Sequence, residues 1–252
     1  MKKKSRIIMV LLLLAAGALP LVAQQPDFDQ MLRDLDQQTT FGDGDFSAVY
    51  TIISERPGEE REVTQARLFR RDQNDQFLIL ILQPEVQRGQ GYLQVDKNVW
   101  FYDPESRKFE RTTIRENIQG SDAQNADLDQ SSYSEDYSVT SWEEGRLGSY
   151  DVYILDLEAT NSGVAYDRVR LWVRKTESIV LKQEDYSVNG RLMRTSLYPR
   201  YERVGSKLMA KQVLIVDELN PGERTQLTMT EATTQQIPDS VFSKAYLERV
   251  NN

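Results

Sequence analysis

Residues 168–200 read RVRLWVRKTESIVLKQEDYSVNGRLMRTSLYPR and decide the fold class. Over residues 168–174, Val169, Leu171 and Val173 alternate with positions that are basic at 168, 170 and 174, a pattern typical of a strand with one buried and one solvated face. Further on, the dipeptide Asn189-Gly190 separates two strand-like runs and favours a two-residue hairpin with positive φ at both central positions. The stretch therefore predicts consecutive antiparallel strands joined by short turns.

Similar runs extend over most of the remaining chain. We predict strands over Phe46–Ile52, Glu62–Arg71, Gln76–Gln83, Gln90–Asp96, Asn98–Tyr102, Arg107–Ile114, Tyr137–Glu143, Tyr150–Ala159, Ala165–Arg174, Ser178–Val188, Arg191–Arg203, Lys207–Asp217 and Glu223–Thr234. Short connections make a continuous antiparallel meander the simplest topology, and about a dozen strands must curl strongly. We expect a mainly β fold, a barrel or half-barrel, with one long interruption at Arg115–Asp136.

The first 23 residues have the pattern of a secretory signal peptide. Basic residues at positions 2–4 and 6 precede an apolar run over 7–19, and polar residues begin at Gln24. Thirteen apolar residues rise about 20 Å as a helix, which is too short for a bilayer core of about 30 Å. We expect cleavage after Ala23, a single domain over 24–252 and a periplasmic or secreted product, not lipidated because no cysteine follows.

Composition excludes much enzyme chemistry. The chain has no His and no Cys, so zinc sites of the usual ligands, thiol nucleophiles and Ser-His-Asp triads are ruled out, and no disulfide can form. Its formal net charge is −8, and the basic residues of the leader do not belong to the expected mature chain, which is more acidic still. Such a charge disfavours nucleic acid and anionic membrane surfaces as partners.

The remaining candidates for chemistry are weak. A carboxylate pair of a glycoside hydrolase and a Ser-Lys pair at Ser206-Lys207 or Ser243-Lys244 stay open, as does calcium binding by Asp122, Asp127 and Asp129 without EF-hand spacing. The aromatic residues Trp100, Tyr102, Trp142 and Trp172 lie on expected strands and are typical of packing. We therefore expect no enzymatic activity, no cofactor and no metal site.

A curled sheet of this size leaves interior space that side chains do not fill, which suits an apolar ligand. Residues 26–38 predict an amphipathic helix whose apolar stripe covers the mouth of such a cavity: Phe28, Met31, Leu32 and Leu35. The expected wall residues are the inward members of two strands: Phe46, Ala48, Tyr50, Ile52, Leu78, Leu80 and Leu82. Residues 77–82 are apolar on both faces, so a central strand covered on both sides by core is the alternative.

The long interruption, Arg115–Asp136, contains almost no large apolar residue. A loop of this length in a compact domain is usually a functional lid or disordered, and the composition favours a mobile loop. Its candidate lid or partner residues are Gly120, Ser121, Asp122 and Asp127.

The order of short motifs from Gly91 onward resembles the outer-membrane lipoprotein-sorting proteins of the LolA/LolB type, in the subgroup found in spirochaetes and other diderms. The motifs are DKNVWFY at 96–102, KFER at 108–111, Gly120-Ser121-Asp122 with Asp127-Leu128, YDVYIL at 150–155, RLWV at 170–173, NGRL at 189–192, IPDSVF at 237–242 and YLER at 246–249. One departure is Ala123-Gln124-Asn125, where the subgroup tends to show an aromatic pair.

This resemblance implies an unclosed β-barrel of about 11–13 strands around a hydrophobic cavity, with helices as a lid. It implies a monomeric periplasmic carrier that takes lipoprotein acyl chains or other lipids from an inner-membrane ABC or RND-type transporter toward the outer membrane. The alternatives are a non-catalytic adaptor of such an export complex, with a fully packed interior, and a periplasmic hydrolase.

Overall fold

The computed structural model describes residues 26–42, 44–95 and 98–250. The predicted signal peptide, residues 1–23, lies outside the described residues. None of the helices in the described part of the chain has the length and apolar character that crossing a bilayer would require.

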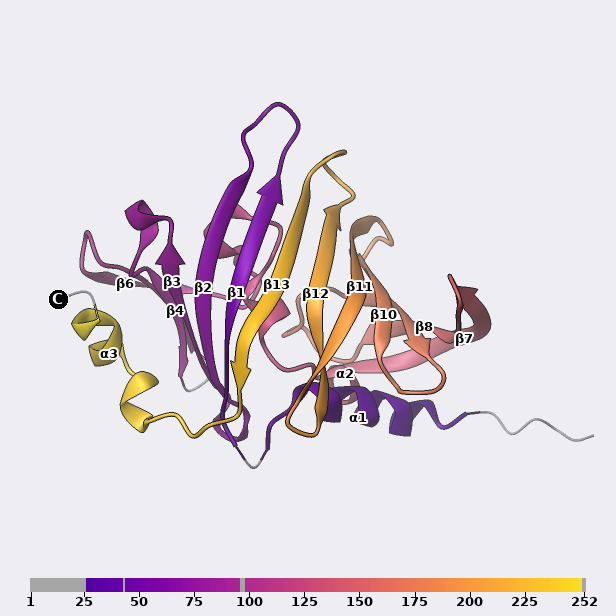
Figure 1. The fold of residues 1–252 in the computed structure, drawn as a ribbon. Coiled ribbons are helices and arrows are strands. Elements are labelled where there is room, and N and C mark those ends of the chain that lie inside the picture. Colours follow the sequence, from indigo (N-terminus) through magenta and orange to yellow (C-terminus); the bar gives the residue numbers. More distant parts are fainter. Residues whose placement is uncertain (1–25, 43, 96–97, 251–252) are drawn as a thin grey trace, which may run out of the picture.

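The described residues form one antiparallel sheet of thirteen strands (Figure 1). These are β1 (Phe46–Glu55), β2 (Glu62–Arg71), β3 (Gln76–Gln83), β4 (Gly91–Val95), β5 (Asn98–Asp103), β6 (Lys108–Thr112), β7 (Tyr137–Leu147), β8 (Tyr150–Ala159), β9 (Arg168–Arg174), β10 (Val180–Tyr186), β11 (Leu192–Val204), β12 (Lys207–Asp217) and β13 (Arg224–Thr233). The expected strands are all present, with shifts of a few residues at their ends.

Consecutive strands pair as predicted, except β6 and β7, which form the two edges of the sheet. The first and last strands pair at its centre, where Tyr50 lies opposite Met229 and Ile52 opposite Leu227. The sheet curls without closing, so the predicted unclosed half-barrel is confirmed.

One turn differs from its prediction. The turn between β10 and β11 closes with the Gly190 N–H donating to the Ser187 carbonyl, and the Ser187 N–H donates to the Arg191 carbonyl. Gly190 has a φ of 76°, whereas Asn189 is not among the residues with positive φ. The loop is longer than two residues, so a single glycine in the left-handed region suffices and the expected two-residue turn is wrong.

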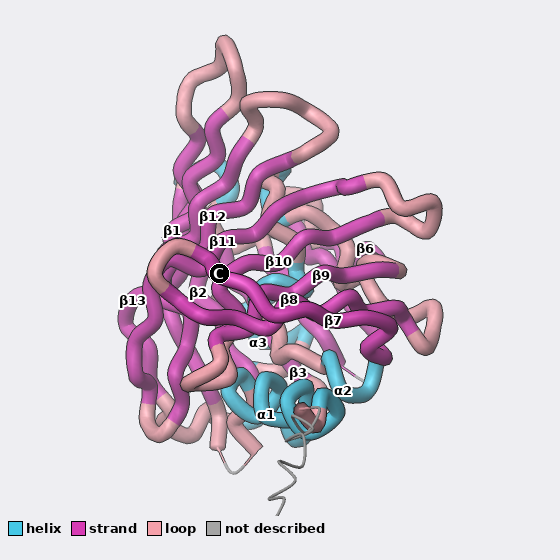
Figure 2. Tube along the Cα trace, turned by 90° about the vertical axis from the view of Figure 1, so that its right-hand side faces the viewer, coloured by secondary structure: helices cyan, strands magenta, loops and turns pink. Residues whose placement is uncertain are grey.

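The helices are short and lie at the margins of the sheet. They are α1 (Phe28–Thr39), α2 (Tyr133–Asp136) and α3 (Lys244–Arg249), with 3₁₀ turns η1 (Asp72–Asn74), η2 (Glu85–Gln87), η3 (Ile118–Gly120), η4 (Asn125–Leu128) and η5 (Asp239–Val241). Asp27 caps α1, because its carboxylate accepts the Gln30 N–H at 2.9 Å. Figures 1 and 2 show α1 and α2 beside each other, and in Figure 1 they lie below strands β10 to β12.

Strand β3 is apolar on both faces because both faces are covered. Phe77, Ile79 and Ile81 belong to the inner core of the half-barrel. Leu78 and Leu80 pack on the other side against the segment that carries η5 and α3. This C-terminal segment is held by Arg71, which binds Asp45 at 2.8 Å, Asp239 at 2.6 Å and the Ile237 carbonyl at 2.5 Å.

Candidate ligand-binding cavity

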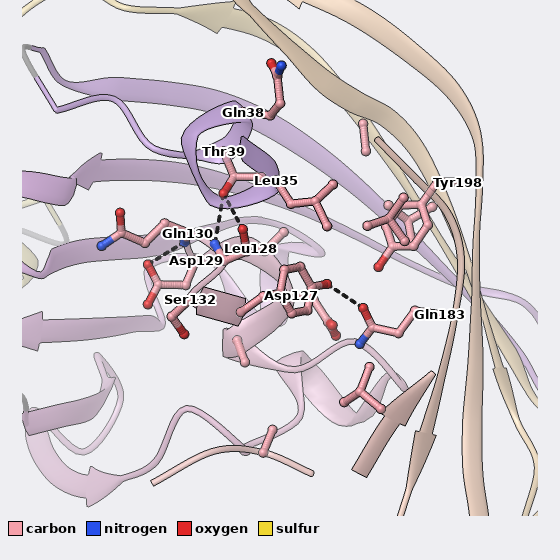
Figure 3. A pocket seen from close by; sticks show the side chains of 18 of the residues that line it. Leu35, Gln38, Thr39, Asp127, Leu128, Asp129, Gln130, Ser132, Gln183 and Tyr198 are labelled. Atoms are coloured by element: carbon pink, nitrogen blue, oxygen red, sulfur yellow. Dashed lines mark hydrogen bonds between the residues drawn. The ribbon is translucent and has the colours of Figure 1, made fainter. Parts of the chain in front are cut away.

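A cavity of about 290 Å³ lies between the inner face of the sheet, α1 and the segment over residues 126–137 (Figure 3). Strands β9 to β13 and β1 supply the wall, and the loop between β8 and β9 supplies part of the rim. The apolar lining includes Leu35, Tyr50, Ile114, Leu128, Val164, Val169, Ile179, Val180, Leu208, Met209, Val213 and Leu227. Polar and charged residues also line it, which the sequence analysis did not anticipate.

The segment Arg115–Asp136 is packed into the half-barrel, so the preference for a mobile loop is wrong. Ile118, Ala123 and Leu128 are buried in the inner core together with strand residues. Asp122 accepts a hydrogen bond from the Thr225 hydroxyl at 2.8 Å, and the Arg115 guanidinium donates to the carbonyls of the loop between β8 and β9. The segment has few large apolar residues, but these three buried side chains and the hydrogen bonds of Asp122 and Arg115 hold it in place.

Helix α1 and α2 are joined by a carboxylate cap. Asp36 accepts the N–H groups of Tyr133 and Ser134, each at 2.8 Å, and so caps α2 from the neighbouring helix. One helical turn further along α1, the hydroxyls of Thr39 and Ser131 lie 2.8 Å apart. The two helices therefore form one cover over the cavity, and we call residues 28–39 and 126–136 the lid.

Arg70 attaches this lid to the wall. Its guanidinium binds Asp72 at 2.6 Å and also donates to the carbonyls of Thr39 and Leu128, one on each half of the lid. Asp72 in turn accepts the Phe41 N–H at 2.6 Å. Because both Arg70 and Asp72 are buried, water does not screen the pair.

A second charged network occupies the other side of the cavity. Arg194 on β11 binds Asp185 on β10 at 2.7 Å and, through both terminal nitrogens, Asp127 of the lid at 2.7 and 2.8 Å. Asp185 is completely buried, and burial raises the pKa of its carboxyl group above its ordinary value, an effect that Arg194 only partly offsets. Gln183 donates to Asp185 at 2.6 Å and accepts the Tyr133 hydroxyl at 2.6 Å, so the network links wall and lid.

Four tyrosines surround this network: Tyr133, Tyr137, Tyr166 and Tyr198. Burial raises the pKa of each of these hydroxyl groups, that of Tyr166 to about 12, and in each case the negative charge of Asp185 adds to the effect. Tyr133 is linked to Asp185 through Gln183, and the Tyr166 ring lies 5.0 Å from the guanidinium carbon of Arg194. We call Asp185 and these residues the tyrosine end of the cavity.

Tyr201 also reaches the cavity, because of an irregularity in β11. Tyr198 and Tyr201 are three residues apart and would face opposite sides of a regular strand, yet both line the cavity. The pairing of β11 with β12 shifts between Leu197 and Tyr201, around Pro199, which cannot donate a ladder hydrogen bond. Proline inside a predicted strand is the one sequence signal for this bulge.

The predicted site residues are distributed over three regions. Leu35, Tyr50 and Asp127 line the cavity. Phe28 and Leu32, with the partly buried Met31, pack between α1 and strands β8 to β10 and so hold the helix in place. Three other residues of β1 share the inward face with Tyr50 and are buried in the inner core, but they do not line the cavity: Phe46, Ala48 and Ile52.

The assignment of β3 to the cavity wall is wrong. Leu78 and Leu80 point to the outer face, where the C-terminal segment covers them. Leu82 lies where the pairing of β3 with β2 shifts register and does not line the cavity. The alternative reading of this strand, with core on both sides, is the correct one. Periodicity alone does not identify the inward face when both faces are apolar.

The candidate lid or partner residues Gly120, Ser121, Asp122 and Asp127 do not form one site. Ser121 is buried and bonds within its own turn, and the Gly120 carbonyl accepts a hydrogen bond from Arg56. Asp127 binds Arg194, so Asp122, Asp127 and Asp129 are not gathered as calcium ligands. Asp122 instead lies with Asp217 and Glu223, whose carboxylate oxygens come within 4.8 Å of its own.

Comparison with known proteins places the chain in a family. A model described as an uncharacterized protein family matches residues 73–249. The chain belongs to that family. No curated protein matches the sequence.

Solved structures share the fold at low sequence identity. A LolA superfamily protein from Nitrosomonas europaea is 23% identical with a TM-score of 0.75, over 86% of this chain and 97% of that one. An outer membrane lipoprotein-sorting protein domain from Vibrio parahaemolyticus is 22% identical with a TM-score of 0.76, over 88% and 98%. A DUF1329 family protein from Desulfovibrio piger is 19% identical with a TM-score of 0.76, over 87% and 97%. The resemblance to the LolA/LolB type is thereby confirmed at the level of the fold.

Proposed function

We propose that this protein is a periplasmic carrier that holds an acyl chain of a lipid or lipoprotein in the cavity and transfers it to the outer membrane. The observation that carries the proposal is the covered cavity inside an unclosed half-barrel, with a lid fastened by a small number of polar contacts. The shared fold of the lipoprotein-sorting domain supports it. Residues 1–23 act in this proposal as the export signal, leaving one domain over 24–252.

The size of the cavity favours a single chain. Its volume of about 290 Å³ lies just below the range of roughly 300–1,000 Å³ for small-molecule sites. Burying fifteen methylenes stabilises a complex by about 12 kcal/mol, at about 0.8 kcal/mol for each. A carrier must release its cargo, so partial enclosure of one chain, offset by the cost of parting the lid, suits transfer better than deep burial of several.

An inner-membrane transporter of the ABC or RND type is the proposed donor of the lipid, and the protein acts as a monomer without catalysis or cofactor. Native mass spectrometry of protein purified from the periplasm tests the carrier directly. Co-purified lipid, or uptake of a fluorescent fatty acid, is the expected result. A clean apoprotein mass together with no uptake of either the fatty acid or an uncharged fluorescent probe contradicts the carrier and favours the adaptor.

Two neighbouring residues of β12 separate a cavity effect from a general one. Val213 lines the cavity, whereas Leu214, on the opposite face of the strand, lines a separate hollow with Ile53 and Arg61. We expect Val213→Asp to weaken uptake of the fluorescent fatty acid about tenfold or more, because the carboxylate must be desolvated or must draw water into the cavity. Leu214→Asp is the matched control and is expected to bind like the unmodified protein.

Circular dichroism and urea titration check that both variants stay folded. Equal uptake by the two folded variants would place the fatty acid outside the cavity. Loss of binding in Leu214→Asp alone would place it on the outer face.

A further inference from the structure

We infer that the tyrosine end of the cavity binds a positively charged, hydrogen-bond-donating head group, so that the preferred cargo is a lipid amine and not a fatty acid anion. This inference rests on the proposed carrier function and adds the chemical class of the ligand. It follows from the charges, the hydrogen-bond pattern and the aromatic rings of the lining.

Negative charge predominates among the residues that line the cavity. The charged ones are Asp127, Asp129, Asp136, Asp185, Arg70 and Arg194. Arg194 is already bound by two carboxylates and Arg70 by Asp72, so neither cation is free to receive an anionic head group. Such a head group would face excess carboxylates in a region of low dielectric, where like charges repel strongly. A cation would instead balance them.

The hydrogen-bond pattern of the lining points the same way. The hydroxyls of Tyr133, Tyr137 and Tyr201 donate to Gln183, to the Tyr166 carbonyl and to the Val180 carbonyl, respectively. Their donor capacity is therefore used within the protein, while the lone pairs of their oxygens stay available. A ligand that offers N–H groups complements such a wall, and one that offers only acceptors does not.

The aromatic rings supply a further attraction for a cation. Tyr133 and Tyr137 have ring centroids 6.3 Å apart, and the guanidinium carbon of Arg194 lies 5.0 Å from the centroid of the Tyr166 ring. One ring of the group thus already faces a cation at the distance of a cation–π contact. Tyrosine faces combined with net negative charge are a typical environment for ammonium groups.

Asp129 extends the negative charge to the lid side of the cavity. Its carboxylate accepts the Gln130 N–H at 2.8 Å and forms no ion pair with a described residue (Figure 3). Burial raises the pKa of this carboxyl group, and the charge of Arg70 offsets only part of that rise. A cationic ligand in the cavity would therefore stabilise its ionised form.

Three amphiphiles of equal chain length test the inference: dodecylamine, dodecanol and dodecanoate, each below its micellar concentration. Displacement of an uncharged fluorescent probe from the full mature chain gives their dissociation constants. We expect dodecylamine to bind about tenfold more tightly than dodecanoate, with dodecanol between them. The preference is expected to persist at 0.5 M salt, because a contribution from the acidic protein surface would be screened there.

Two tyrosine variants locate the preference. Tyr198→Leu removes a ring from the tyrosine end and is expected to reduce the ratio of amine to acid affinity at least threefold while leaving dodecanol binding nearly unchanged. Tyr150→Leu is the matched control, since Tyr150 is an exposed residue at the start of β8. Asp129→Asn leaves all rings in place and is expected to reduce the same ratio.

The outcomes separate the two proposals. Equal binding of the three amphiphiles, tighter binding of dodecanoate, or a preference that disappears at 0.5 M salt would overturn the inference and leave the carrier standing. Binding of none of the three would overturn the carrier and the inference together. If Tyr198→Leu does not fold, the ratio in the unmodified protein and in Asp129→Asn still decides.

Discussion

Replacing Arg194 by methionine is expected to reduce the free energy of unfolding by about 3–5 kcal/mol at neutral pH. The side chain is buried and binds Asp185 and Asp127 through three nitrogens, so its removal leaves two carboxylates without a cation. Urea denaturation measures the loss. Arg170→Met on β9 is the matched control: Arg170 binds Asp156 at 2.6 Å, but the pair is about one-third exposed and worth at most about 1 kcal/mol.

The loss in Arg194→Met is expected to depend on pH with a defined sign. Burial raises the pKa of Asp185 in the folded protein above that in the unfolded chain, and loss of Arg194 raises it further. At a pH between the pKa of Asp185 in the unfolded chain and its pKa in the folded variant, the folded state binds more protons. The free energy of unfolding of the variant therefore increases as the pH falls. The deficit relative to the unmodified protein should therefore be smaller at pH 5 than at pH 8. An equal or larger deficit at pH 5 would mean that Asp185 is not the group left uncompensated.

A disulfide between Thr39→Cys and Ser131→Cys is expected to slow exchange of bound lipid at least tenfold. The two hydroxyl oxygens lie 2.8 Å apart across the two halves of the lid, so the sulfur atoms that replace them start close to bonding distance. The chain has no native cysteine that would form a competing pair. Fluorescent fatty acid is loaded in the reduced state, the bond is formed, and release to vesicles is followed before and after reduction.

The slower exchange expected for the disulfide variant requires that α1 separates from residues 126–136 when lipid enters or leaves. Gly42, beside α1, has open space around its Cα but no positive φ, so its conformational freedom is not used in the closed arrangement. If the oxidised protein releases lipid as fast as the reduced one, the lid moves as one body or the cargo leaves elsewhere. Gly42→Ala then distinguishes these two possibilities. If the lid moves as one body about residue 42, the added side chain is expected to slow lipid release; if the cargo leaves elsewhere, the release rate is expected to stay the same.

Much of the fold was predictable because its signals are local. Alternating residues such as Val169 and Val173 and turn residues such as Gly190 gave thirteen strands, and the apolar spacing of residues 28–35 gave α1. The pairing of β1 with β13 joins residues nearly the whole chain apart, and no local pattern encodes it. The family resemblance supplied the open half-barrel that periodicity left undecided.

The site was less predictable because it depends on which face points inward and on long-range pairing. Leu78 and Leu80 were assigned to the cavity because alternation does not distinguish the two apolar faces of β3. Asp185 and Arg194 lie on strands that also carry less buried charged residues, such as Glu184 and Arg200, and only their contacts with each other and with Asp127 across the cavity distinguish them. Tyr201 became a lining residue through the bulge near Pro199, which shifts the alternation of β11.

The central pairing of β1 with β13 has a consequence for the timing of folding. Tyr50 and Met229 must meet before the two arms of the sheet are joined, so the chain does not complete its core until its last strand has been made. Contacts that span so much sequence slow folding, since a large loop must close before they form. A polypeptide destined for export has to reach the translocation machinery unfolded. If this chain is exported as proposed, its strand order would delay the native state until the last strand has crossed the membrane, and the last step of folding would take place on the far side.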